Sequence, residues 1–169
     1  MKAVILGVGN ILLTDEAAGV RAAEKIQQMC DFGDDVQVLD GGTAGMELLE
    51  SLSDLDALII LDAVHTGDAP GTVIQLEGEK VPGFFRNRIS PHQLGISDVL
   101  AMLQLTGQAP RHLVLIGVVP ESMDTGVGLT PCVEQRIPEM VNRALTAAAD
   151  CGLTWRPREA HPQGVAGCA

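Results

Sequence analysis

The stretch Ala57-Leu-Ile-Ile-Leu-Asp62 decides the fold of this 169-residue chain, because an unbroken apolar run ends in a carboxylate. A strand with one wet face alternates apolar and polar residues, whereas a strand of a parallel sheet is covered on both faces and is apolar throughout. Two further continuous runs, residues 3–8 and 113–119, share the second pattern. We therefore predict strands that lie in the middle of a mostly parallel sheet.

The segments around these runs complete the pattern. Residues 36–39 form a further short apolar run, and residues 71–77 alternate apolar with polar side chains, as an edge strand does. Apolar residues at helical spacing lie between the strands, in the ranges 22–30, 45–52, 96–103 and 133–148. This alternation of strands and helices predicts an α/β sandwich with a mostly parallel sheet.

Local signals suggest where helices and the domain begin and end. Thr14 or Asp15 is expected to cap the first helix, and Ser90-Pro91 supplies a cap and a proline at the first helical position. Neither a linker nor a repeat interrupts the sequence, so we predict a single domain over residues 1–154. Residues 155–169 hold two prolines and two glycines without periodicity, and we expect a loose tail there.

Composition excludes several classes of function. The chain has 22 Asp and Glu against 11 Lys and Arg, a net charge of −11, so neither nucleic-acid binding nor a polybasic membrane contact is expected. No apolar run reaches the roughly 18 residues that span a bilayer, and a buried first strand explains the apolar N-terminal run better than a signal peptide does. Its four cysteines form no CxxC pair, and a core of this size needs no disulfide, so cytoplasmic free thiols are expected.

Carboxylates follow several predicted strands at the end where an open α/β sheet binds its ligands. Asp62 ends the apolar run, and a carboxylate there is costly unless it is paired, which favours a functional role. Glu16 follows the first strand near a helix start, where an acid also complements the helix dipole. Asp40 precedes Gly41 and Gly42, whose backbone can approach a ligand closely, although an Asx turn explains Asp40 equally well.

One histidine stands in a comparable position. His92 lies just inside the helix start at Ser90-Pro91, and a capping or surface histidine is the alternative interpretation. Two carboxylates and a histidine at one sheet edge form a nitrogen–oxygen ligand set that suits zinc, nickel, iron or manganese. Gly7-Val-Gly9 matches a dinucleotide loop only in part, because Leu12 stands where the third glycine belongs, so no nucleotide cofactor is expected.

Several motifs accompany the strand end at Asp62, and they are Gly7-Val-Gly-Asn-Ile-Leu-Leu-Thr-Asp-Glu16, Leu39-Asp-Gly-Gly-Thr-Ala-Gly45, Ile89-Ser-Pro-His-Gln-Leu-Gly95, Gly117-Val-Val-Pro-Glu-Ser122 and Gly128-Leu-Thr-Pro131. In this order, over residues 2–150, they resemble the motifs of the nickel–iron hydrogenase maturation endopeptidases. The resemblance implies a three-layer α/β/α sandwich around a twisted, mixed five-stranded sheet. It also implies a cytoplasmic endopeptidase that removes a C-terminal extension from the hydrogenase large-subunit precursor after nickel insertion.

The same resemblance implies roles for individual residues. Glu16, Asp62 and His92 are expected to contact nickel, carried by the substrate, and to form the catalytic group. Asp40, with the following Gly41-Gly42 pair, is expected to take part in substrate recognition. A monomer whose partner is the hydrogenase large-subunit precursor is expected.

The sequence also limits the chemistry of the predicted reaction. It contains no legible Ser–His–Asp or Cys–His set, so water is expected to attack the peptide bond in place of a covalent nucleophile. A carboxylate acting as an aspartic-type general base and a metal that lowers the pKa of water both remain open. The alternative function is a nickel-binding chaperone without hydrolytic activity, and a nucleotide-binding module is disfavoured by the missing glycine.

Overall fold

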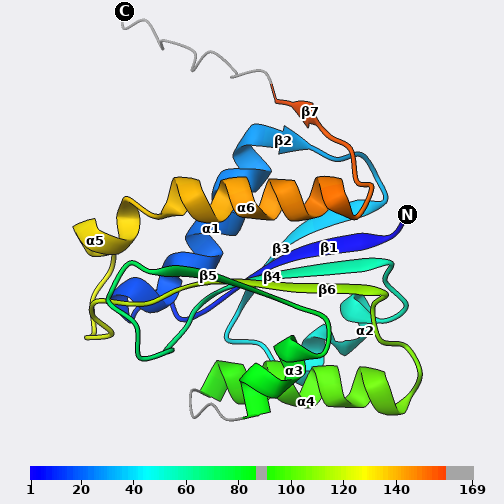
Figure 1. The fold of residues 1–169 in the computed structure, drawn as a ribbon, viewed down its shortest axis with the longest axis horizontal. Coiled ribbons are helices and arrows are strands. Elements are labelled where there is room, and N and C mark those ends of the chain that lie inside the picture. The colour runs from blue at the N-terminus through cyan, green and yellow to red at the C-terminus, as the bar shows by residue number, and fades with distance from the viewer. Residues whose placement is uncertain (87–90, 159–169) are drawn as a thin grey trace, which may run out of the picture.

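A mixed five-stranded sheet forms the centre of the fold, with strand order β3-β1-β4-β6-β5 (Figure 1). The computed structural model describes residues 1–86 and 91–158, and for Pro91 and His92 it describes the backbone alone. The strands of this sheet are β1 (Ala3–Val8), β3 (Val36–Gly42), β4 (Ala57–Ala63), β5 (Val73–Glu77) and β6 (His112–Val118). β1 pairs in parallel with β3 and β4, β4 pairs in parallel with β6, and β5 pairs antiparallel with β6. The predicted α/β class with a mostly parallel sheet is confirmed.

The continuous apolar runs form the middle of the sheet, as predicted. Every residue of β1 and β4 is buried, because helices cover both faces of these strands. β5 lies at the edge of the sheet, and its exposed residues are Gln75 and Glu77. The alternating pattern of this segment therefore correctly predicts a strand with one solvent-exposed face.

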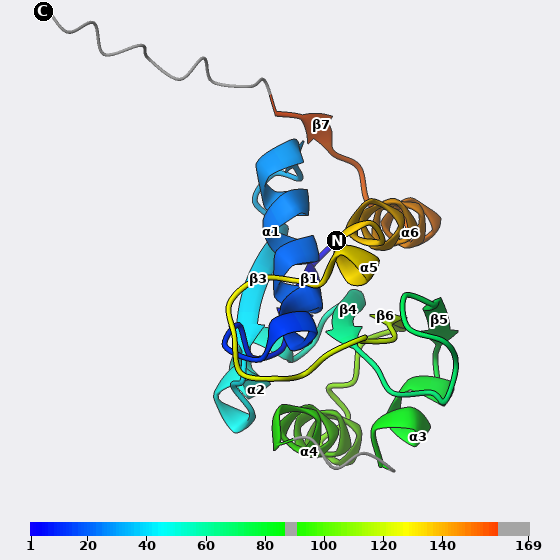
Figure 2. The ribbon, with the colours of Figure 1, turned by 90° about the vertical axis from the view of Figure 1, so that its left-hand side faces the viewer.

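Helices pack on both faces of the sheet and give three layers (Figures 1 and 2). One face is covered by α1 (Ala18–Met29) and α6 (Ile137–Asp150), and the other by α2 (Leu49–Leu52), α3 (Lys80–Arg86) and α4 (Pro91–Leu105). Successive strand residues enter two separate aliphatic cores, so that Ile59 packs on the side of α1 and α6 while Ile60 packs on the side of α3 and α4. No described helix has the length and hydropathy to cross a membrane.

The start of the first helix differs from the prediction. A 3₁₀ turn, η1 (Thr14–Ala17), precedes α1, and neither element has a side-chain cap. The predicted cap by Thr14 or Asp15 is wrong, because both side chains bond to the segment between β6 and α5 instead. Ser90, the predicted cap of α4, lies outside the described residues, while Pro91 does begin that helix.

Three helical segments also depart from the predicted periodicity. The range 45–52 forms two short pieces, η2 (Met46–Leu48) and α2. The range 133–148 is divided into α5 (Pro131–Glu134) and α6, with Pro138 in the first turn of α6. α3 was missed, because its proline and glycine, Pro82 and Gly83, weaken the helical signal of a seven-residue segment.

The chain after α6 returns to the body of the protein. β2 (Cys30–Asp31) and β7 (Arg156–Pro157) form a small antiparallel pair outside the main sheet. Trp155 packs on Phe32 with ring centroids 5.5 Å apart, and Arg158 Nε donates to the carbonyl oxygen of Cys30 at 3.0 Å. The segment expected to be loose from residue 155 is therefore held in place as far as residue 158, and residues 159–169 lie outside the described part.

Candidate active site

The carboxyl ends of β1, β3, β4 and β6 meet at one edge of the sheet, which faces the viewer in Figure 2. Glu16 reaches this edge from η1, and Asp62 is the penultimate residue of β4. Both side chains are buried, with 3% and 0% of their surface exposed. Aspartate and glutamate are almost never fully buried unless they are paired, so these positions need a specific explanation. The structure places both carboxylates at the edge predicted from the sequence.

Close backbone packing holds the segment that carries Glu16 against the strand ends. Gly19, in the first turn of α1, lies so near β4 that a Cβ there would overlap the carbonyl oxygen of Leu61. Gly9 adopts φ 134° and lies against the carbonyl of Glu16, where a Cβ would also overlap. Larger residues at these two glycines would push η1 away from the ends of β1 and β4.

Asp62 is bonded on both of its carboxylate oxygens. Its Oδ1 accepts from the backbone N–H of Ala63 at 2.8 Å, and its Oδ2 accepts from Gln93 Nε2 at 3.0 Å. Gln93 is itself buried and also donates to the carbonyl oxygen of Ala63 at 3.1 Å. The first turn of α4 is thereby tied to the end of β4, a contact that the sequence analysis missed.

His92 precedes Gln93 in this first turn of α4. Three residues further on, Gly95 packs against Gly45, and a Cβ on Gly95 would lie 2.9 Å from the Cα of Gly45. The backbone at His92 is thus held beside the end of β4, on a helix that also contacts the segment following β3. The His92 side chain lies outside the described set, and among the described side chains no three His, Cys, Asp or Glu gather closely enough to hold a metal ion.

Gln93 offers a test of this tie between α4 and β4. We expect Gln93→Met to lower the free energy of unfolding by about 2 kcal/mol, since two buried hydrogen bonds are lost, one of them to a carboxylate. Urea unfolding measures the change. The matched control is Gln108→Met, because Gln108 Nε2 donates to Asp54 at 3.1 Å in an exposed position. The control should change stability by less than about 0.5 kcal/mol, and equal losses in the two variants would contradict the importance of the buried contact.

Asp40, Gly41 and Gly42 form a tight turn at the end of β3. Asp40 is exposed, and its Oδ1 accepts from the N–H of Gly42 at 2.8 Å, which is the Asx turn weighed in the sequence analysis. Gly42 has φ 47°, and a Cβ on the buried Gly41 would lie 2.8 Å from Leu6 Cδ1. These contacts explain the turn, and a role of the three residues in substrate recognition stays a prediction.

Burial disfavours two of the three described thiols as nucleophiles. Cys30, Cys132 and Cys151 are free cysteines. Burial raises the pKa of the Cys30 thiol and of the Cys151 thiol, so both are poor thiolate sources at neutral pH. Cys132 lies beside Gly71, with its Sγ 3.0 Å from the position of a Cβ on that glycine.

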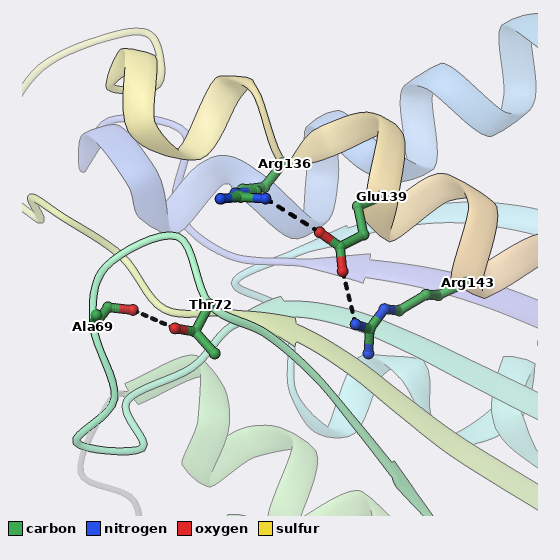
Figure 3. A network of polar contacts seen from close by, with 5 residues as sticks. All are labelled: Ala69, Thr72, Arg136, Glu139 and Arg143. Carbon is green, nitrogen blue, oxygen red and sulfur yellow. Dashed lines mark hydrogen bonds and ion pairs between the residues drawn. The ribbon is translucent and has the colours of Figure 1, made fainter.

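A polar network on α6 lies near the turn that precedes β5 (Figure 3). Glu139 pairs with Arg136 at 3.6 Å and with Arg143 at 2.7 Å, while Thr72 Oγ1 donates to the carbonyl oxygen of Ala69 at 2.7 Å. The three charged side chains are each more than one third exposed. Such pairs contribute little to stability and carry no chemistry of their own.

A second buried carboxylate beside Glu16 was also missed as a site residue. Asp15 is fully buried and accepts backbone N–H bonds from Glu121, Ser122 and Thr130. In the sequence Asp15 resembled a helix cap, and nothing near it indicates that it bonds to backbone groups more than a hundred residues away. It joins η1 to the segment that crosses the edge of the sheet between β6 and α5 (Figure 2).

The chain is similar to known proteins in sequence and in structure. A family model described as hydrogenase maturation protease matches residues 20–147. The chain is 52% identical over 161 residues to the hydrogenase 2 maturation protease of Escherichia coli K12, with 95% of this chain and 98% of that protein covered. It is 40% identical to the hydrogenase expression/formation protein HupD of Thiocapsa roseopersicina, over 92% of this chain and 72% of that protein.

Solved structures show the same fold. The hydrogenase maturating endopeptidase HybD from E. coli superposes with a TM-score of 0.91 at 51% identity, over 94% of this chain and 98% of that chain. The NiFe hydrogenase maturation protease HybD from Thermococcus kodakarensis superposes with a TM-score of 0.72 at 27% identity, over 88% and 99%. The family model, the curated relatives and the solved structures together show that this chain belongs to the hydrogenase maturation protease family.

Proposed function

We propose that this chain removes the C-terminal extension of a nickel–iron hydrogenase large-subunit precursor, and that it acts after nickel has been inserted. The observation that carries the proposal is the pair of buried carboxylates, Glu16 and Asp62, at the edge where the parallel strands end. Its membership of a protease family supports hydrolysis of a peptide bond. We further propose that it acts as a monomer in the cytoplasm.

The electrostatics of the edge support recognition of a cation. Glu16 and Asp62 are buried carboxylates at the same edge of the sheet, and carboxylates that share a site repel unless a cation or a proton relieves the repulsion. Carboxylate and imidazole donors suit nickel among the first-row metals. In this proposal Glu16, Asp62 and His92 complete the coordination of a nickel ion that belongs to the precursor, so that an empty precursor binds poorly.

Water is the attacking group in the proposed reaction. The raised pKa values of the Cys30 and Cys151 thiols disfavour these cysteines as nucleophiles. One carboxylate of the pair can take the proton of the water as a general base, and substrate-bound nickel can alternatively lower the pKa of that water. Asp40 and the Gly41-Gly42 pair are proposed to contact the peptide beside the cleaved bond.

The proposal is tested by mixing the protein with nickel-loaded and with nickel-free precursor and weighing the large subunit by mass spectrometry. We expect the loss of a C-terminal peptide from the loaded precursor alone. Cleavage of both forms would contradict recognition of nickel but would still support peptidase activity. If the mass of the large subunit is unchanged and the precursor gains nickel, the function is that of a nickel-binding chaperone and not of a protease.

A further inference from the structure

Asp15 is a buried charged side chain that the proposed chemistry does not use. Its Oδ2 accepts from the N–H of Glu121 at 2.9 Å and of Ser122 at 3.0 Å. Its Oδ1 accepts from the N–H of Thr130 at 2.7 Å, and the Thr130 hydroxyl lies within 3.0 Å of both carboxylate oxygens. Both ends of the segment 120–130 are therefore bonded to one carboxylate.

The backbone beside Asp15 is joined to the same segment. The N–H of Asp15 donates to the carbonyl oxygen of Ser122 at 3.2 Å, and the N–H of Thr14 donates to that of Gly126 at 3.0 Å. Gly126 in turn donates to the carbonyl oxygen of Leu12 at 2.8 Å. Segments that are about a hundred residues apart in the sequence thus run side by side at the edge that holds Glu16.

Backbone strain at Thr14 shows how strongly this arrangement is imposed. Thr14 has φ 45°, a conformation that costs a β-branched residue energy and persists only where the surroundings hold it. Its hydroxyl donates to the carbonyl oxygens of Ser122 at 2.8 Å and Asp124 at 3.2 Å. The contacts to the segment 120–130 offset that cost, which indicates that the segment has a fixed place beside η1.

We propose that Asp15 is a positioning residue that holds the segment 120–130 as a fixed wall against which the precursor chain binds. The inference rests on the proposed function, because the segment between β6 and α5 crosses the edge at which β1 and β4 end, where the cleaved bond is proposed to lie (Figure 2). Glu16 itself keeps other supports, since its N–H donates to the carbonyl oxygen of Leu13 at 3.0 Å and Gly9 packs on its carbonyl. Loss of the Asp15 contacts therefore weakens precursor binding more than it slows the chemical step.

Asp15→Asn tests the wall, because an amide nitrogen would face donors that now point at a carboxylate oxygen. We expect the KM for the nickel-loaded precursor to rise about tenfold, with kcat within about twofold of the wild type. Thr130→Val removes the hydroxyl contact and keeps the backbone N–H, so its KM should rise by less, about threefold. The exchange of the amide hydrogens of Glu121, Ser122 and Thr130, followed by NMR, should accelerate in Asp15→Asn.

The matched control is Asp56→Asn at the opposite end of the sheet. Asp56 also accepts a backbone N–H, from Lys2 at 2.9 Å, and pairs with Arg111 at 3.4 Å. This variant should lower the melting temperature and leave the KM unchanged. An unchanged KM in Asp15→Asn and Thr130→Val, or an effect on kcat alone, would overturn the inference. If Asp15→Asn does not fold, the KM of Thr130→Val is the test.

A separate measurement keeps this inference distinct from the proposed function. The dissociation constant of the precursor is measured by calorimetry for the wild type and for the same variants. Wild-type protein that binds the precursor without cleaving it contradicts the proposed protease activity, while weaker binding by Asp15→Asn still supports the wall. Equal affinities of the wild type, Asp15→Asn and Thr130→Val would refute the wall even where cleavage is observed.

Discussion

We expect Asp62→Asn to reduce kcat for cleavage of the nickel-loaded precursor by roughly a thousandfold, while the protein stays folded. The substitution keeps the size of the side chain and removes its charge. It therefore removes both of the roles proposed for Asp62, as a ligand of the substrate's nickel and as an acceptor of the water proton.

The cost to stability should be small beside that loss. The amide oxygen of the new asparagine can still accept from the N–H of Ala63, which now bonds to Oδ1 at 2.8 Å. Its NH₂ group would face Gln93 Nε2, so one buried hydrogen bond is lost, at a cost of about 1–2 kcal/mol. Since folded domains have about 5–15 kcal/mol of stability, most of the variant remains native.

Cleavage is measured by the mass of the large subunit, and folding by circular dichroism and thermal melting. Glu16→Gln and His92→Gln should give the same loss of processing. The control is Asp68→Asn, an exposed carboxylate after β4 that accepts from Thr66 Oγ1 at 2.6 Å, and it should cleave normally. Normal cleavage by Asp62→Asn, Glu16→Gln and His92→Gln together would refute the proposed ligand trio.

The middle of the sheet could be predicted because burial on both faces leaves a mark in the sequence. β1 and β4 have no exposed residue, and their apolar runs, residues 3–8 and 57–61, contain no polar position that would suggest an alternating strand. The same logic located Asp62, because a carboxylate that directly follows such a run must lie at the edge of the sheet. These features depend on residues that are close together in the sequence.

The contacts of Asp15 and Gln93 could not be predicted, because their partners are far away in the sequence. Gln93 bonds to a carboxylate 31 positions earlier, and Asp15 bonds to N–H groups 106 to 115 positions later. Seen locally, Asp15 is an acid before a helix, which favours a cap. The tertiary contact prevailed, since three backbone N–H groups satisfy a buried carboxylate better than one helix terminus does.

The structure of the segment after α6 also depends on contacts with residues that are distant in the sequence. Trp155 has no periodic neighbours, so the segment that follows α6 looked loose. Its ring packs on Phe32, and the backbone after it pairs with β2, contacts that no pattern within residues 155–158 reveals. The signal that was available is that Trp155 is the single tryptophan of a chain with only three phenylalanines and no tyrosine, since such a large aromatic side chain is usually packed.

Gly19→Ala should both destabilise the protein and impair cleavage, although replacing a glycine in a helix with alanine usually stabilises the helix. A Cβ at this position would overlap the carbonyl oxygen of Leu61 and would come within 2.6 Å of the carbonyl oxygen of Val8. Both atoms belong to the backbone of central strands, so α1 must move outward. Overpacking of this kind costs about 3 kcal/mol, which outweighs the gain in helix propensity of about 1 kcal/mol.

We therefore expect a net loss of about 2 kcal/mol, or a fall in the melting temperature of about 4–8 °C for a chain of this length. Gly83→Ala in α3 is the matched control, because a Cβ at Gly83 would meet no atom within 4 Å. That variant should be neutral or more stable by up to about 1 kcal/mol.

Because η1 precedes α1 directly, an outward shift of α1 also carries Glu16 away from Asp62. Gly19→Ala should therefore lose cleavage even at temperatures where it is fully folded. Normal cleavage together with the expected loss of stability would show that the reaction does not depend on the spacing of these two carboxylates.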